Sequence, residues 1–83
     1  LTPAALRAVA GRYEGRRIDI VDGKLLYTWR DRFRLSLEPL GADLFAIEGV
    51  ADFRFRFLRK AGRVTTLQRI NRDGTTIDYA RLD

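Results

Sequence analysis

The chain has 83 residues, of which 46% are hydrophobic, and a formal net charge of +5 at pH 7. Such a length suffices for one domain that buries only roughly 60–65% of its unfolded surface, so we expect little spare stability. The chain contains neither cysteine nor histidine, which excludes disulfides, thiolate metal sites and nucleophiles activated by an imidazole. It has no apolar run near the roughly 20 residues of a membrane span. Because it starts at Leu1 and contains no methionine, we expect residues 1–83 to be one domain cut from a larger protein.

A short helix is predicted at the start of the chain. Thr2 can cap the free amide groups, and Pro3 is tolerated at the first helical position because its missing N–H had no partner there. Leu6 and Val9 fall on one face, and Gly11 suits a left-handed residue that ends a helix. We expect this helix to cover one end or edge of a sheet.

A β-hairpin is predicted around Asp22-Gly23, after a brief first strand over residues 12–15. This dipeptide lies between two segments in which apolar and polar residues alternate, which is the strongest short-range hairpin signal. A two-residue turn fixes which residues of the two strands face each other. Counted outward from the turn, the expected pairs are Val21–Lys24, Ile20–Leu25, Ile18–Tyr27 and Arg16–Trp29.

The period of two resumes at Phe33 and continues to Leu37, and Pro39-Leu40-Gly41 is predicted to turn the chain. If Phe45 and Ile47 share the buried face, the register of the next pair of strands follows. The expected pairs are Leu37–Phe45 and Leu35–Ile47 inside and Arg34–Glu48 outside.

The segment from Phe53 to Phe57 alternates phenylalanine with arginine. In an extended strand this places three rings on one face and the guanidiniums of Arg54 and Arg56 on the other. Three phenyl rings bury on the order of 150–250 Å² each, so this strand should supply a large share of the core. The other strands must therefore curl around it.

After a turn over residues 60–62, the apolar residues Val64, Leu67 and Ile70 do not alternate cleanly. Either a β-bulge intervenes or both faces are partly covered, and the pattern leaves this register open. Residues 71–74 supply the last turn and residues 75–82 the last strand.

The predicted fold is mainly β: a short N-terminal helix followed by an antiparallel up-and-down meander of about eight strands. A flat sheet would leave two exposed edges and an uncovered apolar face, so we expect it to curl into a small or partly open barrel. The predicted core consists of Tyr13, Ile18, Ile20, Leu25, Tyr27, Phe33, Leu35, Leu37, Phe45, Ile47, Phe53, Phe55, Phe57 and Ile77, with Leu6 covering from the helix.

The sequence predicts no catalytic, cofactor-binding or metal-binding residue, and therefore a protein that is not an enzyme. Ser36 is the only serine and is expected to be structural. Paired carboxylates such as Asp19 and Asp22 lie beside turns, where nothing would raise a pKa to make a general acid. Residues 71–74 superficially resemble a calcium loop, but the required ligands are missing before and after them.

Two groups of residues are candidates for a ligand or partner surface. Aromatic side chains at the mouth of the barrel would suit a small apolar or peptide ligand, and arginines aligned across strands would suit a phosphate backbone. Nucleic-acid binding is the less favoured alternative, because the phenylalanine rings face away from Arg54 and Arg56. The candidate residues are Tyr13, Tyr27, Trp29, Arg30, Arg32, Arg34, Arg54 and Arg56.

Five segments together resemble a known family. They are Thr2-Pro3-x-x-Leu6-x-x-Val9-x-Gly11-x-Tyr13, the hairpin from Ile18 to Leu25, Leu37-x-Pro39-Leu40-Gly41-x-Asp43-x-Phe45, the phenylalanine strand, and Gly62-x-Val64-Thr65-x-Leu67. The chain resembles the small C-terminal domain, formerly of unknown function, of bacterial serine hydrolases of the beta-lactamase-related and tail-specific-protease-like type. These segments carry packing and turn information, so the resemblance transfers no catalytic residue.

The resemblance implies a lipocalin-like β-meander in an exported, periplasmic bacterial protein. It also implies a non-catalytic accessory module that packs against or gates a parent hydrolase domain, or that mediates self-association. The alternative from the residues themselves is a β-barrel that binds a small apolar or peptide ligand.

Overall fold

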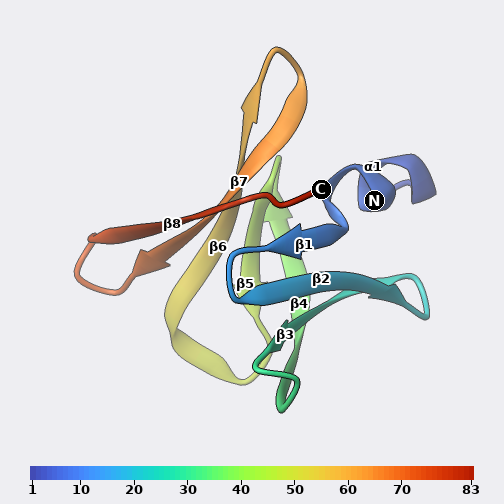
Figure 1. Ribbon diagram of the computed structural model, residues 1–83. Coiled ribbons are helices and arrows are strands. Elements are labelled where there is room, and N and C mark those ends of the chain that lie inside the picture. The colour runs from blue at the N-terminus through green and yellow to red at the C-terminus, as the bar shows by residue number, and fades with distance from the viewer.

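The computed structural model describes residues 1–83 and contains one helix and a single 8-stranded antiparallel sheet (Figure 1). The strands are hydrogen-bonded in sequence order from β1 to β8, so the predicted up-and-down meander is confirmed. The elements are α1 (Pro3–Val9), β1 (Gly11–Tyr13), β2 (Arg16–Val21), β3 (Lys24–Trp29), β4 (Phe33–Gly41), β5 (Leu44–Ile47), β6 (Val50–Lys60), β7 (Arg63–Asn71) and β8 (Thr76–Ala80).

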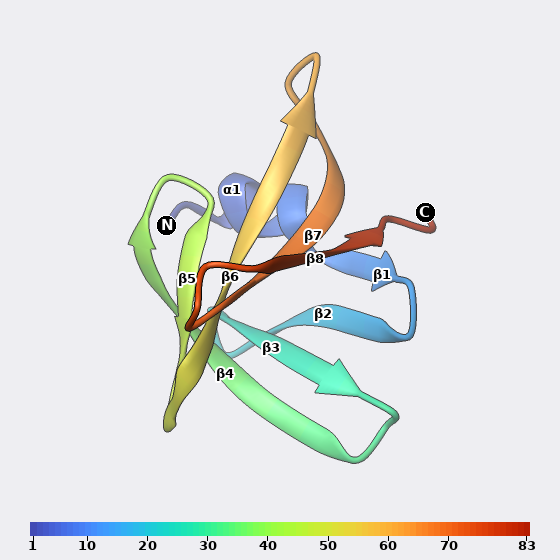
Figure 2. The ribbon, with the colours of Figure 1, turned by 90° about the vertical axis from the view of Figure 1, so that its left-hand side faces the viewer.

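The sheet curls until its two edge strands meet, as the views in Figures 1 and 2 show. Tyr13 on β1 and Arg81 just after β8 form an antiparallel bridge. On either side of this bridge, the amide of Glu14 donates to the carbonyl of Ala80 at 3.0 Å and the amide of Leu82 donates to the carbonyl of Arg12 at 2.8 Å. The result is a nearly closed barrel in which β1 and the end of β8 are joined at this one place.

The turns of the meander fall into two sets at opposite ends of the barrel. Helix α1 lies with the turns at residues 22–23, 42–43 and 61–62, and we call this the helix end. The turns at residues 14–15, 30–32, 48–49 and 72–74 form the other end, which no helix covers and which we call the open end. In Figure 2 the helix lies behind the strands.

The core is one cluster of 13 buried hydrophobic residues. Phe55 and Phe57 are 0% and 2% exposed, whereas Arg54 and Arg56 are exposed on the outer face, so the period-two interpretation of β6 is confirmed. The ring of Phe55 lies 4.6 Å from that of Tyr27, measured between centroids. The cluster comprises Leu6, Val9, Tyr13, Ile18, Leu25, Tyr27, Leu37, Phe45, Ile47, Phe55, Phe57, Val64 and Leu67.

The prediction of a buried side chain is wrong for three residues of the expected core. Ile20, Phe33 and Ile77 are 39%, 51% and 45% exposed, because they lie near strand ends, beyond the layers where rings from opposite walls meet. Leu35 and Phe53 are only partly buried and pack against the edge of the cluster. Alternation predicts which way a side chain faces, but not whether the opposite wall reaches far enough to cover it.

The predicted register between β4 and β5 is wrong by two residues. Leu37 lies opposite Ile47, and Pro39 lies opposite Phe45. Strand β4 continues through the predicted Pro39-Leu40-Gly41 turn, with an irregularity between Pro39 and Gly41, and the chain turns at residues 42–43 instead. A shift of two residues keeps every side chain on its predicted face, so the apolar pattern could not distinguish the two registers.

The outer pair expected from that register is therefore absent. Arg34 lies opposite Thr28 on β3, and the amide of Glu48 donates to the carbonyl of Ser36 at 2.9 Å. By contrast, the hairpin around Asp22-Gly23 has all four of its predicted residue pairs.

A β-bulge resolves the register that the sequence left open. Leu58 lies opposite Thr66, but the next residue, Arg59, lies opposite Val64, so Thr65 is an extra residue in β7. The bulge reverses the alternation, and Val64 and Leu67 are consequently both buried although they are three positions apart.

Helix α1 begins as predicted, since the hydroxyl oxygen of Thr2 accepts a hydrogen bond from the amide of Ala5 at 3.1 Å. It ends at Val9, and Ala10 is already extended, so Gly11 starts β1 and does not terminate the helix as expected. With 7 residues, α1 is too short to cross a bilayer, and the chain has no other helix.

Replacement of Phe55 by alanine tests the central position of β6. Because Phe55 is fully buried among other rings, Phe55→Ala should lower the free energy of unfolding by about 3–5 kcal/mol through lost burial and the cavity left behind. Arg54→Ala and Arg56→Ala should change it by no more than about 0.5 kcal/mol, since both side chains are exposed. Urea denaturation of the three variants measures the contrast, and equal stabilities would contradict it.

Candidate functional site

Two of the predicted surface residues, Tyr13 and Tyr27, lie inside the barrel. They are 1% and 5% exposed. The hydroxyl of Tyr13 donates to the carbonyl of Val9 at 2.7 Å, and the hydroxyl of Tyr27 accepts from Nη1 of Arg16 at 3.3 Å. Both tyrosines are therefore core residues, and their side chains fill the interior of the barrel.

Trp29 lies at the open end, as the sequence predicts. Its ring stacks on Phe33 with a centroid distance of 5.3 Å and an interplanar angle of 28°. The guanidinium of Arg30 lies 4.7 Å from the centroid of the same ring. Trp29 is partly buried by these neighbours and is thus one part of a cluster, not an isolated platform.

The remaining candidate arginines form no continuous stripe. Arg30, Arg32 and Arg34 are exposed in the β3–β4 turn and at the start of β4. Arg54 and Arg56 are exposed on β6, and strand β5 separates β4 from β6 in the sheet. The two groups therefore do not line up across neighbouring strands, which was the arrangement expected for binding a phosphate backbone.

The hollows of the protein lie at its surface. One of about 230 Å³ lies at the helix end and is lined in part by Leu1, Leu6 and Phe45. Another of about 220 Å³ lies over β1–β3 and contains Thr28, whose buried hydroxyl has no hydrogen-bond partner. Two larger hollows, of about 330 Å³ beside Phe53 and about 380 Å³ beside Ile18, reach only the lower end of the roughly 300–1,000 Å³ of typical ligand sites.

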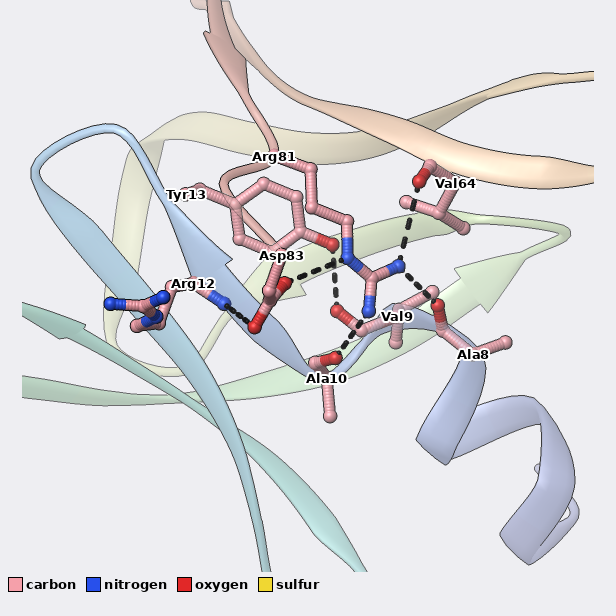
Figure 3. A network of polar contacts seen from close by, with 8 residues as sticks. All are labelled: Ala8, Val9, Ala10, Arg12, Tyr13, Val64, Arg81 and Asp83. Atoms are coloured by element: carbon pink, nitrogen blue, oxygen red, sulfur yellow. Dashed lines mark hydrogen bonds and ion pairs between the residues drawn. The ribbon is translucent and has the colours of Figure 1, made fainter.

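The largest polar network of the molecule surrounds Arg81 at the helix end (Figure 3). Its Nη1 donates to the carbonyl of Ala8 at 2.8 Å and its Nη2 to that of Ala10 at 2.7 Å. Its Nε binds the carboxylate of Asp83 at 3.1 Å. The last carbonyls of a helix have no partner within the helix, and here Arg81 supplies donors for two of them.

The same network explains Gly11. The carboxylate of Asp83 also accepts from the amide of Arg12 at 3.1 Å, which brings the end of the chain against the start of β1. A Cβ atom at Gly11 would lie 2.6 Å from Oδ1 of Asp83 and 3.0 Å from Nη2 of Arg81. Because this network is saturated by groups of the chain itself, we assign it a structural role.

The open end contains a second cluster that the sequence reasoning did not single out. The Cζ atom of Arg16 lies 3.4 Å from the ring centroid of Tyr79, and that of Arg69 lies 3.9 Å from the ring centroid of Phe53. The ring of Phe53 in turn packs edge-on against Phe55 at 5.5 Å. Arginine–aromatic pairs of this kind stabilise by about 0.5–2 kcal/mol each.

Only part of this cluster could have been predicted. Arg16 has the same parity as Ile18, so alternation alone places it on the inner face of β2. The inward direction of Arg69 follows from its position two residues after Leu67, beyond the bulge that the sequence could not locate. The contact of Arg16 with Tyr79 joins β2 to β8 and depends on closure of the barrel.

Arg16 and Arg69 differ electrostatically from the ion-paired arginines of the chain. At the helix end, Arg59 and Arg81 bind carboxylates at 2.8 and 3.1 Å. At the open end, Arg17 pairs with Asp31 at 3.5 Å, whereas neither Arg16 nor Arg69 has a carboxylate within 4.0 Å. Burial raises the pKa of the Tyr27 hydroxyl, and both of these guanidiniums oppose that rise, so they lie around the same phenol.

Comparison of the chain with models of protein families, with curated proteins and with solved structures gave no match.

Replacement of Arg81 by lysine tests the network at the helix end. Lysine keeps the charge but lacks the planar fork that reaches two carbonyls and a carboxylate together. Since hydrogen bonds to charged groups contribute about 1.5–3 kcal/mol each, Arg81→Lys should lower the free energy of unfolding by about 2–3 kcal/mol. Arg63→Lys, at an exposed position on β7, is the matched control and should change it by less than about 0.5 kcal/mol. Equal urea midpoints for the two variants would show that the network is not needed.

Tyr13 should make the protein less stable in alkali. Burial raises the pKa of its hydroxyl from 10.0 to about 12, and the nearby Arg81 only partly opposes this rise. The unfolded chain therefore releases this proton first, so the stabilisation is complete below pH 10 and is lost as the pH rises from 10 to 12. At about 1.4 kcal/mol per pKa unit the loss approaches roughly 3 kcal/mol.

Urea denaturation between pH 9 and pH 12 measures this loss, with Tyr13→Phe as the comparison. The variant cannot ionise at this position, so most of the pH dependence should disappear, and Tyr27, whose pKa burial also raises, should account for the remainder. A Tyr13→Phe variant with the full pH dependence would contradict the assignment.

Proposed function

We propose that the chain is a non-catalytic protein-interaction module that docks through the open end of its barrel. The observation that carries this proposal is the composition of that end. Phe33 and Ile77 are 51% and 45% exposed there, beside the partly buried rings of Trp29 and Tyr79. Aromatic residues and arginine are the residue types that contribute most binding energy at protein interfaces.

The arginines strengthen this assignment. Arg16, Arg30 and Arg69 lie against the aromatic rings of the open end, each within 4.7 Å of a ring centroid. Such contacts hold long side chains in one conformation, so less conformational entropy is lost when a partner binds. Exposed apolar side chains beside fixed, charged donors are well suited to binding a protein surface.

The filled interior argues against the alternative of a ligand-binding barrel. Tyr13, Phe55 and Leu67 are each no more than 1% exposed, and their side chains occupy the space where a ligand would lie. Eight-stranded barrels are just wide enough for side chains to fill, and this one is filled. We therefore favour binding at the rim over binding inside.

The resemblance of the sequence to accessory domains of bacterial serine hydrolases supports a specific partner. On that basis the module would pack against or gate the catalytic domain of an exported parent hydrolase, or join two copies of it. The absence of cysteine and histidine from the chain is consistent with a role that leaves catalysis to another domain.

Substitution of the exposed apolar residues of the open end tests the proposal. The double variant Phe33→Thr/Ile77→Thr replaces them with a smaller polar residue that strands tolerate. We expect the unmodified chain to bind the separately produced hydrolase domain, measured by calorimetry, or to self-associate, measured by sedimentation. The double variant should bind at least tenfold more weakly.

The control is Val21→Thr/Leu40→Thr at the helix end. These residues are exposed to a similar extent, 46% and 49%, but lie away from the cluster of rings and arginines. Retained binding is expected. Equal losses in the two double variants, or no association of the unmodified chain in either experiment, would refute the open end as the docking surface.

A further inference from the structure

Two guanidiniums at the open end have no counter-ion in this chain. Arg16 on β2 and Arg69 on β7 lie on the inner face of their strands and are partly buried. Moving a charge out of water is costly unless a group of opposite charge or several hydrogen bonds compensate. Neither of these two charges is neutralised by a carboxylate of the chain.

Both side chains are held in place by contacts that leave their outer amino groups free. Nε of Arg16 donates to the carbonyl of Glu14 at 2.7 Å, and its Nη1 reaches Tyr27. Nε of Arg69 donates to Oδ1 of Asn71 at 2.8 Å. Nη2 of Arg16 and both terminal amino groups of Arg69 consequently have no acceptor in the protein.

Aromatic rings set the direction of the free groups. The guanidinium of Arg16 lies over the ring of Tyr79, and that of Arg69 lies over the ring of Phe53. Their apolar neighbours reduce the screening of charge by water, so an anion at these guanidiniums would be bound more strongly than on the open surface.

We infer that Arg16 and Arg69 bind a carboxylate of the partner protein. The inference rests on the proposed docking through the open end and names the group that this end recognises. The planar fork of arginine matches the two oxygens of a carboxylate. The aromatic surroundings favour a carboxylate attached to an apolar body, because a doubly charged phosphate is costlier to remove from water.

A pair of small probes tests this without the partner. N-acetylphenylalanine has an aromatic ring and a carboxylate, and N-acetylphenylalaninamide differs only in lacking the charge. We expect nuclear magnetic resonance titration of the 83-residue chain to show saturable shifts at the Nε groups of Arg16 and Arg69 with the acid. The amide should bind at least tenfold more weakly.

Substitutions of single arginines locate the site. Arg69→Gln should abolish saturable binding of the acid, and Arg16→Lys should weaken it while the charge remains. Arg54→Gln, which removes the same charge from the exposed outer face of β6, should leave binding unchanged. Equal binding of acid and amide, or equal effects of Arg69→Gln and Arg54→Gln, would overturn the inference.

Inorganic phosphate and a single-stranded oligonucleotide complete the test. If either one binds at Arg16 and Arg69 more tightly than the acid does, the site prefers phosphate to a carboxylate and the inference is overturned. Failure here is distinguishable from failure of the proposed function. If Phe33→Thr/Ile77→Thr abolishes partner binding and Arg69→Gln does not, the carboxylate site is refuted and the proposed docking stands. If Arg69→Gln abolishes partner binding and the double variant does not, the carboxylate site stands and docking through Phe33 and Ile77 is refuted.

Discussion

The meeting of the first and last strands is the constraint on which the rest of the barrel depends. Backbone hydrogen bonds join β1 to the residues after β8. The guanidinium of Arg81 reinforces this closure, because it donates to the carbonyls of Ala8 and Ala10 and pairs with Asp83, which in turn accepts from the amide of Arg12. A planar group with five donors can satisfy a helix end and a carboxylate together, which lysine cannot.

This closure makes the two ends of the barrel chemically different. At the helix end the groups around Arg81 satisfy one another (Figure 3), and α1 buries Leu6 and Val9 in the core. At the open end Arg16 and Arg69 are ordered by aromatic rings but have no anion. The network around Arg81 is therefore saturated within the chain, whereas Arg16 and Arg69 keep free amino groups, on which the proposed docking relies.

The small size of the barrel leaves its interior filled by its own side chains. Rings from β3, β5 and β6 meet across the interior, with Tyr27 4.6 Å from Phe55 and Phe45 5.5 Å from Phe57. In a chain of this length those contacts are the core, and removing them to open a cavity would remove most of the stability. A partner can thus be bound outside the barrel without disturbing what holds it together.

The sequence by itself determined the features that depend on neighbouring residues: the outward arginines of β6, the cap at Thr2 and the register of the hairpin at Asp22-Gly23. Alternation and turn chemistry act over a few residues, so a linear pattern records them. Only the tertiary structure decided the β4–β5 register, the bulge at Thr65 and the meeting of Arg16 with Tyr79. Registers two residues apart bury the same face, and contacts across the closed barrel join strands that no local pattern relates.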